Sequence, residues 1–175
     1  MTDMKTWEAF LAASSSNLFL LLDGAAIPSL WDTLHRIESD LVCLPLYLQT
    51  EFAALLDISP YIVQIMPSSP LLNEFRTNTD FAKAGILFSS FESLQDLKKR
   101  LTNILTVLTP SYNEMFFRFY DPYVLDLLVR AGETSLLDTV CGPAKCIAWI
   151  FQISDSPAFD RVTIYPANRG NHAKA

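Results

Sequence analysis

The length, composition and charge of this chain already exclude several classes of protein. With 175 residues, half of them hydrophobic and 18% charged, the chain has the size of one domain and enough apolar side chains for a sizeable core, which excludes disorder in bulk. Its net charge of −6 argues against a surface for nucleic acid or for an anionic membrane, because both require clustered positive charge.

Short apolar strands alternate with amphipathic helices along the chain. This order predicts an α/β fold with a mixed, largely parallel sheet of about five to six strands flanked by helices. The expected strands are at residues 18–22, 41–44, 61–65, 86–88, 115–120 and 146–153, with a further short one at 162–165. The first strand is apolar throughout, which indicates burial on both faces and a central position in the sheet.

Prolines and capping residues mark where three helices are expected to begin. Pro28 suits the first position of a helix in which apolar residues recur at helical spacing. Ser69-Pro70 and Asp121-Pro122 each combine an N-cap side chain with a proline in the first turn.

A longer helix is expected after the strand at 86–88. Ser89 and Glu92 have the spacing of a capping box, and an apolar stripe then continues to Leu108. The basic run at 98–100 falls largely on the opposite, solvated side of this helix.

These elements form one expected domain, which spans residues 1–166, and the polar residues 167–175 are expected to form a flexible tail. The apolar run at 18–22 is too short to span a bilayer, and no compact basic start precedes it, so neither membrane insertion nor a secretory signal is predicted. An odd number of cysteines, three, without a disulfide-rich framework favours a reducing, cytoplasmic location.

Side chains suited to catalysis are scarce. A nucleophile usually needs a histidine base, and the two histidines are His35, on the expected polar face of a helix, and His172, near the end of the chain. The five glycines form no phosphate-binding loop, and Cys141 and Cys146 lack a second pair of zinc ligands. We therefore predict no catalytic residue, no cofactor and no metal site, and interpret the cysteines, Cys43 included, as small buried hydrophobic residues.

The one dense polar cluster is the run 117–122, where the end of an expected strand delivers Arg118 and Asp121 to a turn. Because the carboxyl ends of strands in open α/β sheets often carry sites, an enzymatic role is one interpretation. Partner recognition is a second. We favour a third, structural role, in which Asp121 caps the next helix and Arg118 pairs with Asp121, Asp23 or another buried carboxylate.

With these motifs in view, the chain resembles the bacterial type VI secretion effector adaptors, also called effector chaperones, a former domain of unknown function. The most specific motif is R-F-Y-D-P-x-V-L, present here as Arg118-Phe119-Tyr120-Asp121-Pro122-Tyr123-Val124-Leu125. The other matching runs, in the same order, are L-L-L-D-G-A at 20–25, C-L-P-L-Y at 43–47, S-P-Y-I-V at 59–63, S-P-L-L at 69–72, G-I-L-F-S-S at 85–90 and G-P at 142–143.

The resemblance implies a non-catalytic adaptor, encoded beside a VgrG spike protein and a toxic effector, that binds its cognate effector in the cytoplasm and helps load it onto the spike. Two alternatives stay open: a small α/β ligand-binding domain or enzyme that uses the Arg118/Asp121 corner, and an immunity-type protein that binds and neutralises a toxin. Tyr123 stands where the family often has arginine, and aromatic side chains dominate binding hot spots, so we select Tyr123 as the candidate partner-binding residue. The expected structural motif comprises Asp23, Arg118, Tyr120, Asp121 and Pro122.

Overall fold

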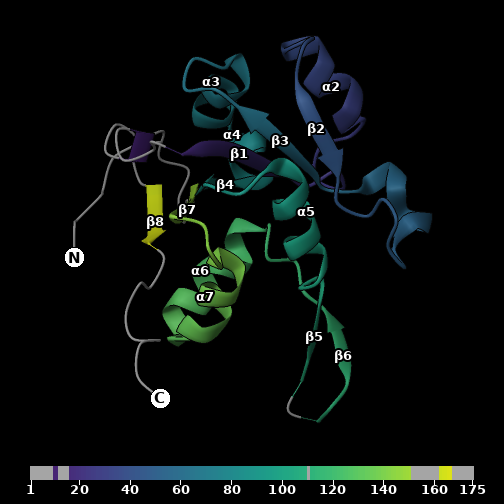
Figure 1. The fold of residues 1–175 in the computed structure, drawn as a ribbon, viewed down its shortest axis with the longest axis vertical. Coiled ribbons are helices and arrows are strands. Elements are labelled where there is room, and N and C mark those ends of the chain that lie inside the picture. Colours follow the sequence, from purple (N-terminus) through teal and green to yellow (C-terminus); the bar gives the residue numbers. More distant parts are fainter. Residues whose placement is uncertain (1–9, 12–15, 110, 151–161, 167–175) are drawn as a thin grey trace.

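The computed structural model describes residues 10–11, 16–109, 111–150 and 162–166. The expected tail at 167–175 and the last part of the expected strand 146–153 lie outside these residues. The described elements, shown in Figure 1, are β1 (Asn17–Leu22), α2 (Leu30–Ile37), β2 (Val42–Pro45), the 3₁₀ helix η1 (Ala53–Ile58), β3 (Tyr61–Ile65), α3 (Pro70–Thr77), α4 (Thr79–Lys83), β4 (Gly85–Ser90), α5 (Leu94–Thr102), β5 (Thr106–Leu108), β6 (Glu114–Phe116), α6 (Pro122–Ala131), α7 (Thr134–Cys141), β7 (Cys146–Ile150) and β8 (Val162–Pro166).

Six of the strands form one sheet in the order β2-β3-β1-β4-β7-β8. The α/β class and the expected number of strands are confirmed. The expectation of a largely parallel sheet is wrong, because every pairing within the six-stranded sheet is antiparallel.

The connections explain why strand–helix alternation does not give parallel neighbours here. The chain passes from β1 through α2 to β2, which runs parallel to β1, but β3 lies between the two strands and is antiparallel to both. Likewise, β3 connects through α3 and α4 to the parallel strand β4, and β1 fills the position between them. Each of these two helical crossovers therefore skips one strand, as in a split β-α-β motif.

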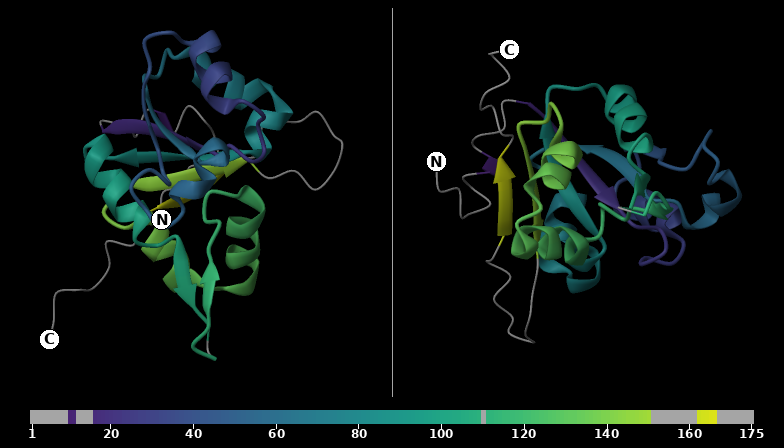
Figure 2. Two further views of the ribbon diagram at one scale, coloured as in Figure 1. Left: turned by 90° about the vertical axis from the view of Figure 1, so that its right-hand side faces the viewer. Right: turned by 90° about the horizontal axis from the view of Figure 1, so that it is seen from below.

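The central strand β1 supplies both faces of the sheet with apolar side chains. Leu18, Leu20 and Leu22 pack into one core with α2, α3 and α4, whereas Phe19 and Leu21 pack into a second core with α5, α6 and α7. Figures 1 and 2 show these helices on the two sides of the sheet. Burial of β1 on both faces and its central position are thus confirmed, and no helix among the described residues is both long and apolar enough to cross a bilayer.

Two of the three expected helix starts are confirmed. The side chain of Ser69 accepts a hydrogen bond from the amide of Leu71, and Asp121 caps α6 in the same way through the amide of Tyr123. The third expectation is wrong, since α2 begins at Leu30 rather than Pro28 and is preceded by a serine in the left-handed conformation (φ 50°).

The expected long helix after residue 88 is replaced by a shorter helix and a strand. The strand β4 continues to Ser90, so the N-cap of α5 is Ser93, whose hydroxyl accepts from the amide of Asp96, rather than Ser89. Ser89 is instead paired in register with Leu18 of β1. The helix ends at Thr102 because the residues that follow pair as the β5–β6 hairpin, with Thr106 opposite Phe116.

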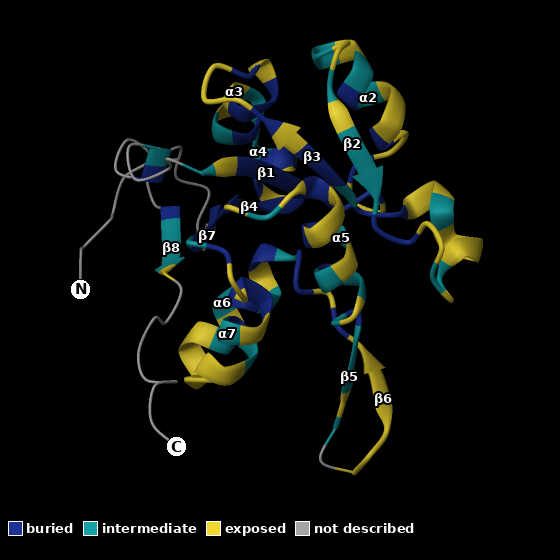
Figure 3. Cartoon of the chain, viewed as in Figure 1, coloured by how far each residue is buried: buried dark blue, intermediate teal, exposed yellow. Residues whose placement is uncertain are grey.

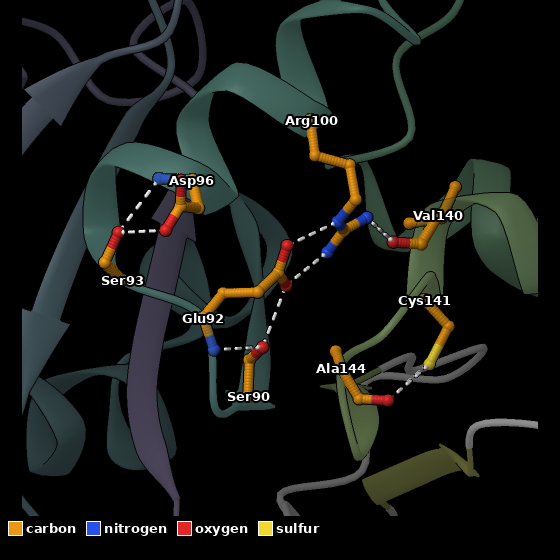
Figure 4. Close-up of polar contacts among 8 residues, drawn as sticks. All are labelled: Ser90, Glu92, Ser93, Asp96, Arg100, Val140, Cys141 and Ala144. Atoms are coloured by element: carbon orange, nitrogen blue, oxygen red, sulfur yellow. Dashed lines mark hydrogen bonds and ion pairs between the residues drawn. The ribbon is translucent and has the colours of Figure 1, made fainter.

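The expectation that Arg100 lies on the solvated side of that helix is wrong. Its guanidinium binds both carboxylate oxygens of Glu92, at 2.9 and 3.0 Å, and donates to the carbonyl oxygen of Val140 at 2.8 Å (Figure 4). Gly142 lies so close that a β-carbon at that position would come within 2.8 Å of the guanidinium. Arg100 thus joins α5 to the carboxyl end of α7.

Candidate functional site

The predicted polar corner forms where residues 117–121 leave the hairpin and enter α6. This segment brings Arg118 to the end of β1, 95 residues away in sequence. A guanidinium nitrogen of Arg118 lies 2.5 Å from a carboxylate oxygen of Asp23 and 3.8 Å from one of Asp121. The structure therefore brings together three of the residues selected from the sequence.

Asp23 is the buried member of this group. Its side chain is 4% exposed, whereas that of Arg118 is 47% exposed, so the carboxylate is the buried charge and the guanidinium reaches it from the surface. The other carboxylate oxygen accepts from the amide of Ala25 at 2.9 Å. Since a buried carboxylate without partners is costly, these bonds account for its position.

Gly24 holds the turn after β1 against the chain that precedes β3. A β-carbon at Gly24 would lie 2.3 Å from the carbonyl oxygen of Ser59, which is far shorter than any normal contact. Only glycine allows this approach. The L-L-L-D-G-A run is therefore explained by a buried strand, a buried carboxylate and a close backbone contact.

Tyr120 lies beneath the ion pair and binds a residue outside the set selected from the sequence. Its hydroxyl is 2.8 Å from that of Tyr47, and both side chains are buried. The guanidinium of Arg118 lies 5.9 Å from the centre of the Tyr120 ring, within the range of a cation–π contact. Tyr47 is the last residue of the C-L-P-L-Y run, so the family resemblance could have identified it. Nothing in that run indicates that Tyr47 binds a distant tyrosine.

The electrostatics of the corner favour fixed protonation states. Burial is the main cause that raises the pKa of both Tyr47 and Tyr120. Burial lowers the pKa of Arg118, but its hydrogen bond to Asp23 and the charge of that carboxylate outweigh burial and leave the pKa raised. The phenols therefore stay neutral and the guanidinium stays charged at neutral pH, which suits a structural network better than proton transfer.

The start of α6 places the last three selected residues in different surroundings. The carboxylate of Asp121 accepts from the amide of Tyr123 at 2.9 Å, and Pro122 is buried in the first turn. The side chain of Tyr123 is 56% exposed, and Leu127, one helical turn further on, is also exposed. Tyr123 thus lies on an outward-facing apolar strip of α6, and its role in binding stays a prediction.

The surroundings of the three cysteines and of His35 do not suit them for catalysis or metal binding. Burial raises the pKa of Cys43 and Cys146 to about 11 and that of Cys141 to about 12, so all three are thiols at neutral pH. His35 contacts the carbonyl oxygen and the ring of Trp31, while His172 lies outside the described residues. Within the part of the chain that the structure describes, no three His, Cys, Asp or Glu side chains come together as a metal site would require.

The β5–β6 hairpin is a strongly exposed apolar element that is not among the features expected from the sequence. It projects from the body of the molecule, and Figure 3 shows its second strand in the exposed class along its whole length. Its exposed apolar and aromatic side chains include Leu108, Tyr112, Met115 and Phe116. The polar, proline-containing run at 109–114 between two apolar segments is a turn signal that could have identified it.

Comparison with known proteins places this architecture in a family. The family model described as Domain of unknown function (DUF4123) matches residues 18–137. The chain is also similar to the accessory protein VasW of Vibrio cholerae serotype O1 (strain ATCC 39315 / El Tor Inaba N16961), with 30% identity over 105 residues that cover 60% of this chain and 35% of VasW. The chain thus spans about a third of the length of that relative, and no solved structure matches it. Because the family model covers well over half of its residues, the chain belongs to the DUF4123 family, the type VI secretion adaptor family that its motifs resemble.

Proposed function

We propose that this protein is a non-catalytic adaptor that binds a cognate effector in the cytoplasm and helps load it onto the VgrG spike. The observation that carries the proposal is the family match across residues 18–137, which contains the whole Asp23–Arg118 corner and the hairpin. The geometry supports it, since the conspicuous polar residues bind one another while large apolar side chains face outward. Exposed apolar patches of this kind are typical of protein-binding surfaces.

The first test is direct binding to the effector encoded beside this gene. We expect the purified protein to bind that effector, to form a ternary complex with VgrG, and to restore secretion when supplied to a strain that lacks it. Inspection of the neighbouring genes is a second check, and a spike gene and an effector gene on either side would favour this function over an immunity function. Protection of a target cell from the effector, without any effect on secretion, would contradict the adaptor function and favour an immunity protein.

The second test concerns Tyr123 as a contact. If Tyr123 fills a partner pocket, Tyr123→Ala should weaken effector binding by about thirtyfold, which corresponds to about 2 kcal/mol. Val129→Ala is the matched control, because Val129 is 43% exposed on another side of the same helix. If both variants keep the wild-type melting temperature and bind the effector with equal affinity, Tyr123 is not a hot spot.

A further inference from the structure

The chain around η1 and the β5–β6 hairpin meet through aromatic side chains. The rings of Phe52 and Phe116 pack edge to face with their centres 5.0 Å apart, and the ring of Tyr47 lies 6.1 Å from that of Phe116. Tyr47 is buried, Phe52 is half-buried and Phe116 is 37% exposed. The aromatic cluster therefore has a buried base and an open outer side.

Local geometry determines which neighbours share the open side of this cluster. Residues two apart on a strand face the same way, so Glu114 lies on the same face of the hairpin as Phe116, opposite Leu108 in the register. At the start of η1, the amide of Leu55 donates to the carbonyl oxygen of Phe52 at 2.8 Å, so a single turn brings these two residues close together. Leu108 is 65% exposed and Leu55 is 46% exposed.

These four apolar residues, which we call the loop–hairpin surface, are Phe52, Leu55, Leu108 and Phe116. They come from two segments that both project from the sheet, and Figure 3 shows each segment largely exposed. Apolar side chains presented together in this way are typical of a surface that a partner covers.

The charges around the loop–hairpin surface have one dominant sign. Residues 46–58 and 106–116 contain Glu51, Asp57 and Glu114 and no lysine or arginine. All three acidic residues are exposed. From α5, Lys98 reaches the start of the first segment and donates to the carbonyl oxygen of Leu48 at 2.9 Å. The local charge therefore stays negative, which favours a partner with positive charge beside its apolar residues.

We propose that the loop–hairpin surface binds a basic amphipathic helix of a partner protein, with the apolar face of that helix on Phe52 and Phe116 and its lysine or arginine residues beside Glu51 and Glu114. The inference rests on the proposed adaptor function, in which the partner is an effector or the spike. Docking of an amphipathic helix by its apolar face fits better than strand addition, because β5 and β6 have three residues each and offer few backbone groups to an added strand.

A defined peptide tests the surface even while the partner is unidentified. The probe is a fluorescent leucine–lysine peptide of about 18 residues whose leucines recur at helical spacing, and the reference is a peptide of the same composition without an apolar face. We expect the full chain to bind the probe more tightly than the reference. Leu55→Ser with Leu108→Ser should weaken binding of the probe about tenfold or more. Met66→Ser with Phe91→Ser is the control, since these apolar side chains are 68% and 63% exposed elsewhere, and it should leave the affinity nearly unchanged.

Charge is tested by variants with equal net charge. Glu51→Lys with Glu114→Lys should abolish the preference for the probe, whereas Asp32→Lys with Asp40→Lys, on α2 and in the turn after it, should retain it. If both pairs of substitutions weaken binding of the probe equally, binding follows net charge alone and the proposal is wrong.

The proposal is also wrong if wild-type protein is a dimer in sedimentation and Leu55→Ser with Leu108→Ser makes it monomeric, because the occupant is then a second copy.

The two proposals fail in different ways. If the effector binds wild-type protein and all of these variants equally, the assignment of the surface is wrong and the adaptor function stands. If the effector and VgrG bind neither wild-type protein nor any variant, the adaptor function is wrong, while the peptide measurements still decide what the loop–hairpin surface binds.

Discussion

Replacing Arg118 by alanine removes the only charged group that the structure places within 4 Å of the Asp23 carboxylate among the described residues. One oxygen of Asp23 keeps its bond from the amide of Ala25, but the other loses a contact of 2.5 Å. Breaking a fully buried pair costs about 3–5 kcal/mol. Because the Arg118 side chain is 47% exposed, water reaches the vacated position, and we expect a smaller loss of about 1–3 kcal/mol in the free energy of unfolding.

Thermal unfolding followed by circular dichroism measures this loss. For a chain of this size, about 2 kcal/mol lowers the melting temperature by about 4–8 °C. Arg130→Ala is the control, because Arg130 binds Asp126 in a surface pair within α6, which is worth less than about 1 kcal/mol. Arg118→Ala combined with Asp23→Asn should be no less stable than Arg118→Ala alone, since a buried amide costs less than a buried charge.

A structural role for Arg118 is refuted if the Arg118→Ala variant has the same melting temperature as wild-type protein and yet no longer binds the effector. Arg118 would then be an interface residue, and its contact with Asp23 would contribute little to folding.

Three further outcomes are expected from buried groups. Arg100→Ala leaves the carbonyl oxygen of Val140 without its donor and the Glu92 carboxylate with only the Ser90 hydroxyl among the described residues, so urea unfolding should show a loss of about 2–4 kcal/mol, more than any effect of Lys99→Ala. Gly24→Ala forces the backbone apart at Ser59 and should destabilise the protein more than Gly132→Ala, where a β-carbon meets no neighbouring atom and the cost is limited to the left-handed backbone conformation (φ 73°). The free energy of unfolding should fall as pH rises above 9.0, because the unfolded cysteines ionise there while burial holds the folded thiols protonated until about 11 or 12. Urea titrations at a series of pH values measure this slope, and replacing the cysteines with alanine should flatten it.

The residues that identify the family are mainly the ones that build the corner. The R-F-Y-D-P motif supplies the ion pair with Asp23, the hydroxyl pair with Tyr47 and the cap of α6. Its apolar member, Phe119, is fully buried. This motif therefore holds β1, the 117–121 segment and α6 together, and in our interpretation partner choice is left to outward-facing side chains of the hairpin and α6.

Local chemistry was sufficient for several features of this protein. The unbroken apolar run at 18–22 identified the central strand, because a strand buried on both faces cannot alternate. Ser69-Pro70 and Asp121-Pro122 identified two helix starts, because an N-cap side chain bonds an amide only two or three residues away. The order of motifs indicated the family, which the comparison of residues 18–137 confirmed.

Strand direction, by contrast, was decided by the tertiary structure. The same alternation of strands and helices suits parallel neighbours or a split β-α-β motif, and the choice of β3 and β1 to fill the skipped positions makes the β2-β3-β1-β4 part of the sheet antiparallel. The apolar stripe up to Leu108 likewise suited a long helix, until pairing with residues 114–116 converted its end into a strand. Contacts such as Arg100 with Val140 and Tyr47 with Tyr120 join residues 40 and 73 positions apart, and no local pattern encodes which distant side chain will satisfy a buried polar group.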